Sequence, residues 1–208
     1  MFGLNSKELT TLKRLNTPAK IQDFLDALPI NYEKRDVTCM SPRRVLRERK
    51  AHCIEGAFLA SVALMLQNKK PLILNLKVME GDKDHIVILF KQNGYWGAIS
   101  KTNHAVLRFR DPIYKTTREL ALSYFHEYFL NSNGKKTLLG YSRPINLKKF
   151  GTKWATEEED LWDIAEKIFD TPYIRFVPKG NERFIRKASL LERKAGALVD
   201  WKKTDLRT

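Results

Sequence analysis

Residues 51–66 read AHCIEGAFLASVALML, and this stretch changes from polar to apolar within a few positions. The apolar part, residues 57–66, predicts a helix that ends before the polar sequence QNKK. Gly56 and the alanines that follow it make the helix rich in small residues, so it can approach a sheet closely. Cys53, one of two cysteines in the chain, falls in the first turn of this helix. The stretch therefore predicts a thiol held at a helix N-terminus, against strand residues.

A thiol in this position is placed for reaction, because the free N–H groups and the dipole of the first turn stabilise a thiolate. His85 opens a strongly apolar segment about thirty residues later, and a neutral imidazole at a strand end can accept the thiol proton. The alternative is an inert core cysteine, since unpaired cysteines are among the most buried residue types. Cys53 and His85 together are a more specific signal than either residue alone.

The segments after this helix have the pattern of strands. PLILNLKVM (71–79) and HIVILFKQ (85–92) are rich in branched and aromatic residues, and Asn93-Gly94 predicts a hairpin turn into YWGAIS (95–100). AVLRFR (105–110) is expected to form a fourth, shorter strand. This run of neighbouring strands predicts a largely antiparallel sheet.

Helices are expected before and after these strands along the chain. The start signals are Thr17-Pro18, Ser41-Pro42, Thr116 with Glu119, and Thr156. They predict helices over residues 17–28, 42–50, 116–128 and 155–170, followed by a strand YIRFV and a basic amphipathic helix over 181–198. The order of helices, strands and helices predicts the α+β class.

The polar sequence NSNGKK (131–136) is the best candidate for a domain boundary. It divides the chain into an N-terminal helical segment (1–34), a core (35–131) and a basic helical C-terminal extension packed on that core (132–208).

The composition is that of an ordinary globular protein, with 43% hydrophobic residues in a chain of 208. No apolar run is long enough for a bilayer span, and the N-terminus has no apolar region typical of a signal peptide. With only two cysteines, these features predict a cytoplasmic protein that does not bind membranes. The net charge of +14 is spread along the chain, and it favours weak, salt-sensitive attraction to nucleic acids without any recognised binding motif.

The sequences HCIEGA (52–57), DHIVILF (84–90) and NGYWGAIS (93–100) resemble the transglutaminase-like superfamily, which includes transglutaminases, related cysteine proteases and peptide N-glycanase-type amidases. More narrowly, the chain is similar to bacterial transglutaminase-like proteins of unassigned function, with the similarity continuing into RFRDPIY and SYFHEY. The resemblance to the superfamily covers about residues 35–115. It implies a papain-like fold and a Cys–His pair with an acidic or amide third member.

The resemblance puts the third member four residues after Trp96, where the superfamily has Asp and this chain has Ser100. A serine cannot supply the negative charge that fixes the histidine tautomer and stabilises imidazolium. Asn103 could orient His85 as the amide does in papain-like enzymes, and Asp111 has the charge but lies beside arginines. We favour the amide, so the candidate catalytic residues are Cys53, His85 and Asn103.

Two further residues near this position are candidates for contact with a substrate. Trp96 could wall a substrate cleft, although a Trp in such a hairpin is more often part of the core. Lys101 could bind a carboxylate of the substrate, with a solvated surface lysine as the alternative.

The leading hypothesis is cysteine-dependent acyl transfer on a protein or peptide substrate, as in a protease, an amidase or a transglutaminase. Cys53 would attack the carbonyl, His85 would act as base and then as acid, and backbone N–H groups at the helix start would hold the oxyanion. No cofactor is expected. No metal is expected either, because the His and Cys residues lack C-x-x-C or H-x-x-x-H spacing.

Two alternatives belong to other classes of protein. Ser100 favours a binding or scaffolding module that keeps the transglutaminase fold without the chemistry. The surplus charge and the basic sequences RRVLRERK and RKASLLERK favour a polyanion-binding protein, although charge runs on helices are usually solvated faces. The sequence leaves open the substrate, hydrolysis or transamidation, the role of residues 137–208 and the oligomeric state.

Overall fold

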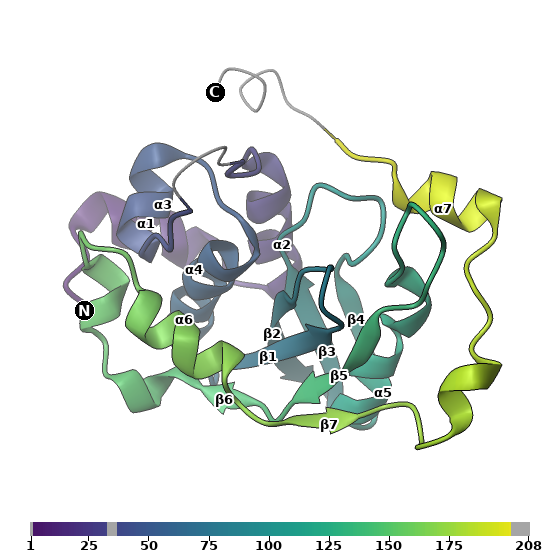
Figure 1. The fold of residues 1–208 in the computed structure, drawn as a ribbon. Helices are drawn as coiled ribbons and strands as arrows, with labels where there is room; N and C mark the ends of the chain where they lie inside the picture. Colours follow the sequence, from purple (N-terminus) through teal and green to yellow (C-terminus); the bar gives the residue numbers. More distant parts are fainter. Residues whose placement is uncertain (1, 33–36, 201–208) are drawn as a thin grey trace.

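The computed structural model describes residues 2–32 and 37–200. A layer of helices lies against an antiparallel sheet, and a smaller set of helical turns covers the other face of that sheet (Figure 1). The predicted α+β class with a mostly antiparallel sheet is therefore confirmed.

The N-terminal part of the chain forms helices that begin where the sequence predicts. The Thr17 hydroxyl accepts from the N–H of Lys20, the Ser41 hydroxyl accepts from the N–H of Arg44, and each helix has Pro as its first residue. The helix that begins at Cys53 is buried from Ile54 to Met65, and it packs against the other N-terminal helices and against the sheet. The bounds are α1 (Ser6–Arg14), α2 (Pro18–Ala27), α3 (Pro42–Glu48) and α4 (Cys53–Leu66).

The sheet has the order β4-β3-β2-β1-β5-β7, with β6 also paired to β1, and these strand pairs are antiparallel. Asn93 and Gly94 have φ values of 48° and 88°, as the tight turn between β2 and β3 requires. Val87 pairs with Ser100, so the start of β2 lies beside the end of β3. The bounds are β1 (Leu72–Val78), β2 (His85–Gln92), β3 (Tyr95–Ser100), β4 (Arg110–Tyr114), β5 (Leu138–Ser142), β6 (Ile145–Asn146) and β7 (Tyr173–Arg175).

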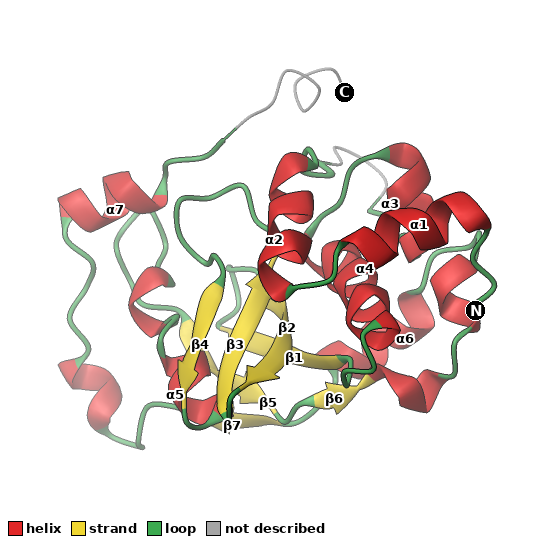
Figure 2. Cartoon of the chain, turned by 180° about the vertical axis from the view of Figure 1, so that it is seen from behind, coloured by secondary structure: helices red, strands yellow, loops and turns green. Residues whose placement is uncertain are grey.

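Both faces of the sheet are buried, because alternate residues of a strand point to opposite faces. Ile86 and Ile88 join the core that contains α4. Val87 and Leu89 join a second core with α5 (Thr117–Leu122) and the residues around the 3₁₀ helix η1 (Phe125–Glu127). Figure 2 shows the helices α1–α4 on one side of the strands and α5 on the other.

The C-terminal part differs from the helical extension that was expected, because it adds β5, β6 and β7 to the sheet. Trp154 and Ile164 also join the core around α4. The last helix, α7, lies apart from the helical layer at the yellow end of the chain (Figure 1). The helical bounds here are η2 (Leu147–Phe150), η3 (Lys153–Thr156), α6 (Trp162–Phe169), η4 (Asn181–Phe184) and α7 (Leu190–Gly196).

The fourth strand was predicted in the wrong place. β4 begins at Arg110, and residues 105–109 form a loop. Leu107 has a φ of 61°, a left-handed conformation that cannot continue a strand. Residues 106 and 107 of this loop line a cavity that Cys53 and His85 also line.

The predicted start at Thr156 was also wrong, because α6 begins at Trp162. The intervening Asp160 is held by another part of the chain: its carboxylate accepts from the N–H of Cys39 at 3.0 Å and pairs with Arg44 at 2.7 Å. A sequence pattern cannot show that Asp160 contacts a distant part of the chain instead of capping the helix that follows it.

Two other expected helices are shorter than predicted. The helix from Thr116 ends at Leu122 and is followed by η1. The basic segment 181–198 is divided into η4 and α7, and Ser189 forms a capping box that starts α7. Within the described ranges, no helix has the length and apolar character that a bilayer span needs.

Candidate active site

Cys53 is the first residue of α4, and a pairing between two chain segments fixes where this helix begins. The N–H of Ala51 donates to the carbonyl of Pro29 at 3.2 Å, and the N–H of Asn31 donates to the carbonyl of Ala51 at 3.1 Å. His52 is the N-cap residue and has an extended backbone. The sulfur is therefore held in a first turn whose N–H groups and dipole favour a negative charge.

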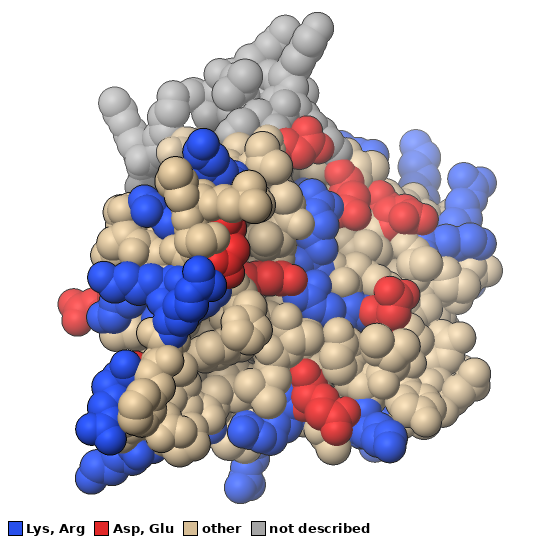
Figure 3. Space-filling model, turned by 90° about the vertical axis from the view of Figure 1, so that its right-hand side faces the viewer, with Lys and Arg blue, Asp and Glu red and all other residues tan. Residues whose placement is uncertain are grey.

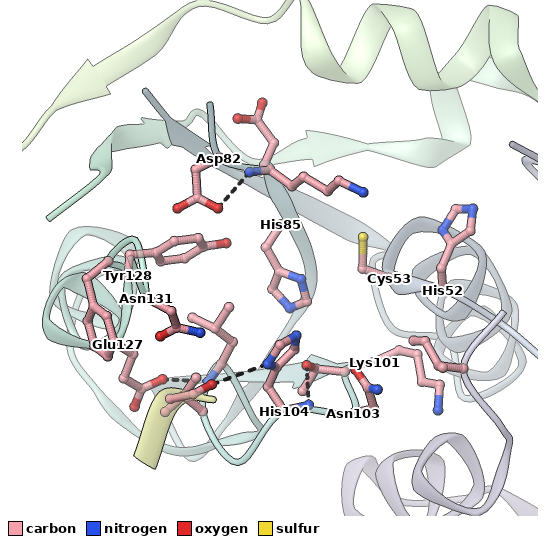
Figure 4. Close-up of a pocket in the computed structure, with 18 of the residues that line it drawn as sticks. His52, Cys53, Asp82, His85, Lys101, Asn103, His104, Glu127, Tyr128 and Asn131 are labelled. Atoms are coloured by element: carbon pink, nitrogen blue, oxygen red, sulfur yellow. Dashed lines mark hydrogen bonds between the residues drawn. The ribbon is translucent and has the colours of Figure 1, made fainter. Parts of the chain in front are cut away.

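The thiol and the imidazole of His85 lie on facing sides of one cleft (Figure 4). Cys53 is partly exposed, whereas His85, the first residue of β2, is 7% exposed. Burial opposes ionisation of the thiol, but hydrogen bonding and charge from His52 and His85 outweigh it. The pKa of Cys53 is consequently lowered well below its ordinary value of 9.0. The structure thus brings together the cysteine and the histidine selected from the sequence.

Ser100 orients the imidazole of His85. Its Oγ lies 2.7 Å from Nε2 of His85 and 2.5 Å from the carbonyl oxygen of Leu107. A hydroxyl has a single hydrogen and a carbonyl oxygen can only accept, so Ser100 donates to Leu107 and accepts from His85. Nε2 therefore carries a hydrogen, and Nδ1 is the nitrogen left to accept the thiol proton.

Ser100 is held on two sides. Gln22 of α2 accepts from its N–H at 2.9 Å and donates to its carbonyl at 2.7 Å. The N–H of Leu107 donates to the carboxylate of Glu127 at 2.7 Å, and Glu127 also pairs with Arg110 at 2.6 Å. These contacts fix the carbonyl that receives the Ser100 hydrogen, and so they fix the histidine tautomer.

His52 places a second imidazole beside the sulfur. Its Nε2 lies 2.8 Å from the carbonyl oxygen of Thr38, so this nitrogen donates. Burial opposes its ionisation, but hydrogen bonding to Cys53, the charges of Glu55 and Cys53, and the bond to Thr38 raise the pKa of His52 to about 9. The raised pKa favours the charged form of His52, and that charge stabilises a thiolate.

Glu55 has a structural role at this helix start. The carboxylate is fully buried and accepts from the N–H groups of His52 and Met40, each at 2.9 Å. It also accepts from the hydroxyl of Thr38 at 2.7 Å and from the amide of Asn31 at 3.1 Å. One carboxylate thus joins the segment before α3 to the cap of α4.

The cleft between these groups has a volume of about 410 Å³. Its wall includes the turn between β1 and β2 at residues 82–84, the loop 101–107 and the segment 127–131. Tyr128 and Asn131 lie on the side opposite Cys53 (Figure 4). The cleft is large enough to hold a side chain of a substrate next to the sulfur.

The end of the described chain closes one edge of this cleft. We call residues 187–200 the C-terminal strap. The guanidinium of Arg193 donates to the carbonyls of Asn131 and Ser132, each at 2.7 Å. The N–H of Ala105 donates to the carbonyl of Leu198 at 2.9 Å. Gly196 of the strap lines the cleft.

Asn103 and Lys101 line the cleft without replacing Ser100 on the imidazole. The backbone carbonyl of Asn103 accepts from the N–H of Asp200 at 2.8 Å, and its side chain forms no hydrogen bond with His85 among those that join the described residues. Lys101 is 3% exposed, and its ammonium donates to the carbonyl of Leu28 at 2.6 Å. The charge of Lys101 thus holds the end of α2.

Trp96 and Asp111 lie away from the cleft. Trp96 pairs with Lys91 at the hairpin end of β3, four residues from Ser100, which is about 13 Å along a strand. Asp111 is exposed on the edge strand β4. Neither residue lines the cavity beside Cys53.

The second cysteine has the opposite environment. Cys39 is fully buried, and burial together with the charges of Glu55 and Asp160 raises its pKa above the ordinary value. Its N–H and carbonyl bind Asp160 and Leu161. The lowered thiol pKa is therefore a property of the Cys53 environment and is not shared by Cys39.

Two residues of the site were not selected from the sequence. His52 was visible as the neighbour of Cys53, and the pair HC at a helix start was the available signal. Tyr128 had no such signal, because its position in the cleft depends on the turn that follows η1. Tertiary packing alone brings it near the thiol.

Among the described residues, no three His, Cys, Asp or Glu side chains gather in a way that could hold a metal ion. Comparison of the chain with protein-family models finds no match. Comparison with curated proteins finds none either.

Proposed function

We propose that this protein catalyses cysteine-dependent acyl transfer on amide or peptide bonds. The observation that carries the proposal is the cleft in which the sulfur of Cys53 has two imidazole neighbours and a lowered pKa. His85, oriented by Ser100, is proposed as the proton carrier. His52 is proposed as the positive charge that keeps the sulfur ionised.

The proposed reaction begins when the thiol proton moves to Nδ1 of His85. The thiolate of Cys53 attacks the carbonyl carbon, and the C=O electron pair moves to the oxygen. When this intermediate collapses, the C–N bond breaks and His85 gives its proton to the leaving amine. The acyl group stays on the sulfur as a thioester, which water or a second amine then cleaves.

The resemblance to the transglutaminase-like superfamily supports the same class of reaction, with a protein or peptide as substrate. A water acceptor would make the protein a protease or an amidase, and an amine acceptor would make it a transglutaminase. Mass spectrometry of a peptide substrate separates these products, since hydrolysis and transamidation change the peptide mass differently.

The first test is the pH dependence of Cys53 alkylation by iodoacetamide. A thiol with a lowered pKa is ionised above that pKa and loses its reactivity as the pH falls through it. We therefore expect the midpoint of the wild-type profile well below 9.0, the ordinary thiol value. In His85→Ala and His52→Gln the midpoint should rise, and at a pH below both midpoints the rate should fall by about tenfold for each unit of that rise.

The controls use the two cysteines of the chain. Cys53→Ala should abolish rapid labelling, and Cys39→Ala should leave the profile unchanged because Cys39 is fully buried. Equal profiles for the wild type and His85→Ala would contradict the proposed pair, and equal profiles with midpoints near 9.0 would favour a binding module with an unreactive thiol.

The polyanion-binding alternative has less support on the face of the molecule that Figure 3 shows. Figure 3 shows one face of the molecule, on which Lys and Arg alternate with Asp and Glu instead of forming one continuous basic patch. A single-stranded oligonucleotide tested at low salt separates the two proposals, because electrostatic binding falls steeply as salt is added.

A further inference from the structure

The hydroxyl of Tyr128 is a buried polar group without a protein partner. Tyr128 is 4% exposed, and its hydroxyl forms no hydrogen bond with any described residue. Buried polar groups are nearly always paired, because an unpaired one costs about 1–3 kcal/mol. An orphaned hydroxyl in a native fold therefore needs an explanation.

The orphaned hydroxyl points into the cleft of the candidate active site. Tyr128 lines the cavity, and Figure 4 shows its phenol ring with the hydroxyl end directed toward His85, across the cavity from Cys53. Burial, followed by the charges of Cys53, Asp82 and Asp84, raises the pKa of Tyr128 well above its ordinary value. The hydroxyl therefore keeps its hydrogen and can donate it.

The ring of Tyr128 is fixed by its surroundings. It packs in the core on the α5 face of the sheet, and its carbonyl accepts from the N–H of Thr137 at 3.2 Å. The preceding residue, Glu127, is tied to Leu107 and Arg110. A donor held this firmly requires little rearrangement when a charge develops next to it.

We propose that the Tyr128 hydroxyl donates a hydrogen bond to the acyl oxygen of the substrate and stabilises the oxyanion that forms when Cys53 attacks. The inference rests on the proposed acyl transfer. In that step the Sγ–C bond forms, the C=O electron pair moves to the oxygen, and this oxygen accepts from Tyr128 without proton transfer. The backbone N–H groups at the start of α4 would supply the other donors.

Tyr124 offers a matched comparison. It is also fully buried, but its hydroxyl donates to the carbonyl of Arg108 at 3.0 Å, and it does not line the cavity. Tyr124→Phe should lower the melting temperature, because it breaks a buried hydrogen bond. Tyr128→Phe should leave the melting temperature unchanged or raise it, because it removes an unpaired polar group.

The experiment compares two reactions of Cys53 in the full chain, acylation by 4-nitrophenyl acetate and alkylation by iodoacetamide. Acylation passes through an oxyanion and releases nitrophenolate, whereas alkylation forms no oxyanion. Loss of one oxyanion donor slows acyl transfer by about 10²–10³-fold in a known case. For this activated ester we expect Tyr128→Phe to slow acylation by at least about tenfold and to change alkylation by less than about twofold.

The outcomes distinguish this inference from the proposed function. Equal acylation rates in the wild type and Tyr128→Phe, with rapid alkylation of both, would overturn the role of Tyr128 and leave the activated thiol in place. Slow alkylation of the wild type would overturn the proposed function and this inference with it. A lower melting temperature for Tyr128→Phe, with both reactions slowed equally, would show that the hydroxyl is structural.

Discussion

At the scale of single residues, the candidate site depends on which atom holds which hydrogen. The sequence could identify Cys53 and His85, because each begins an element whose pattern is clear. It could not identify the role of Ser100, since a serine lacks the charge expected of a third member. The tautomer of His85 is fixed instead by the Leu107 carbonyl, which accepts the Ser100 hydrogen. The left-handed backbone of Leu107 cannot be predicted from a sequence pattern. The assignment of hydrogen-bond donors and acceptors around His85 therefore requires the three-dimensional structure.

Ser100→Ala should reduce the reactivity of Cys53 without unfolding the protein. The substitution removes the acceptor of the His85 Nε2 hydrogen, so the imidazole can turn or change tautomer. We expect the rate of 4-nitrophenyl acetate acylation to fall by at least about tenfold. Ser61→Ala is the control, because Ser61 is also fully buried and donates to a carbonyl, that of Ala57, within α4. Equal rates for the two variants would contradict the role of Ser100.

At the scale of elements, the site lies where α4 begins, β2 begins and β3 ends. The sequence predicted these three elements well, because a small-residue helix and an Asn-Gly hairpin have strong local signals. It predicted the loop 105–109 and the start of α6 poorly, because contacts to distant residues decide both. The small residues of α4 serve the purpose expected of them: a Cβ on Gly56 would lie 2.6 Å from the Cβ of Lys101.

Gly56→Ala should therefore push the end of β3 away from α4. Alanine favours a helix by about 1 kcal/mol over glycine, but overpacking a dense core typically costs about 1–3 kcal/mol. We expect a net loss in the free energy of unfolding, measured by urea denaturation, and slower alkylation of Cys53 in the folded variant. An increase in stability with unchanged alkylation would show that the helix and strand can separate freely at this point.

At the scale of the whole molecule, the C-terminal strap joins the last described residues to the cleft. Its first contact is a tight one: the N–H of Ala188 donates to the carbonyl of Gly134 at 2.8 Å, and Gly134 has a φ of 74°. A Cβ on Gly134 would lie 2.4 Å from the carbonyl oxygen of Ala188. The strap can lie in this position only because residue 134 has no side chain.

Gly134→Ala should release the strap from the rest of the protein. We expect trypsin to cleave at the exposed residues Arg186 and Lys187 faster than in the wild type, by about fivefold or more, because local opening becomes easier. Gly94→Ala is the control, since Gly94 has a φ of 88° but a Cβ there would meet nothing within 4 Å. Mass spectrometry of the early fragments gives the cleavage sites. Equal cleavage of both variants would mean that the strap is not held at Gly134.

The division of the site between α4 and the β2–β3 hairpin has a consequence for how the chain reaches its native state. The hairpin carries His85 and Ser100 through one tight turn, so these two side chains meet as soon as the hairpin forms. Cys53 comes with α4 and meets them only after the helix docks. Until then its sulfur has the reactivity of a free amino acid in water. In the Cys39→Ala variant, a short pulse of alkylating agent during refolding would therefore time the arrival of the helix through Cys53 alone.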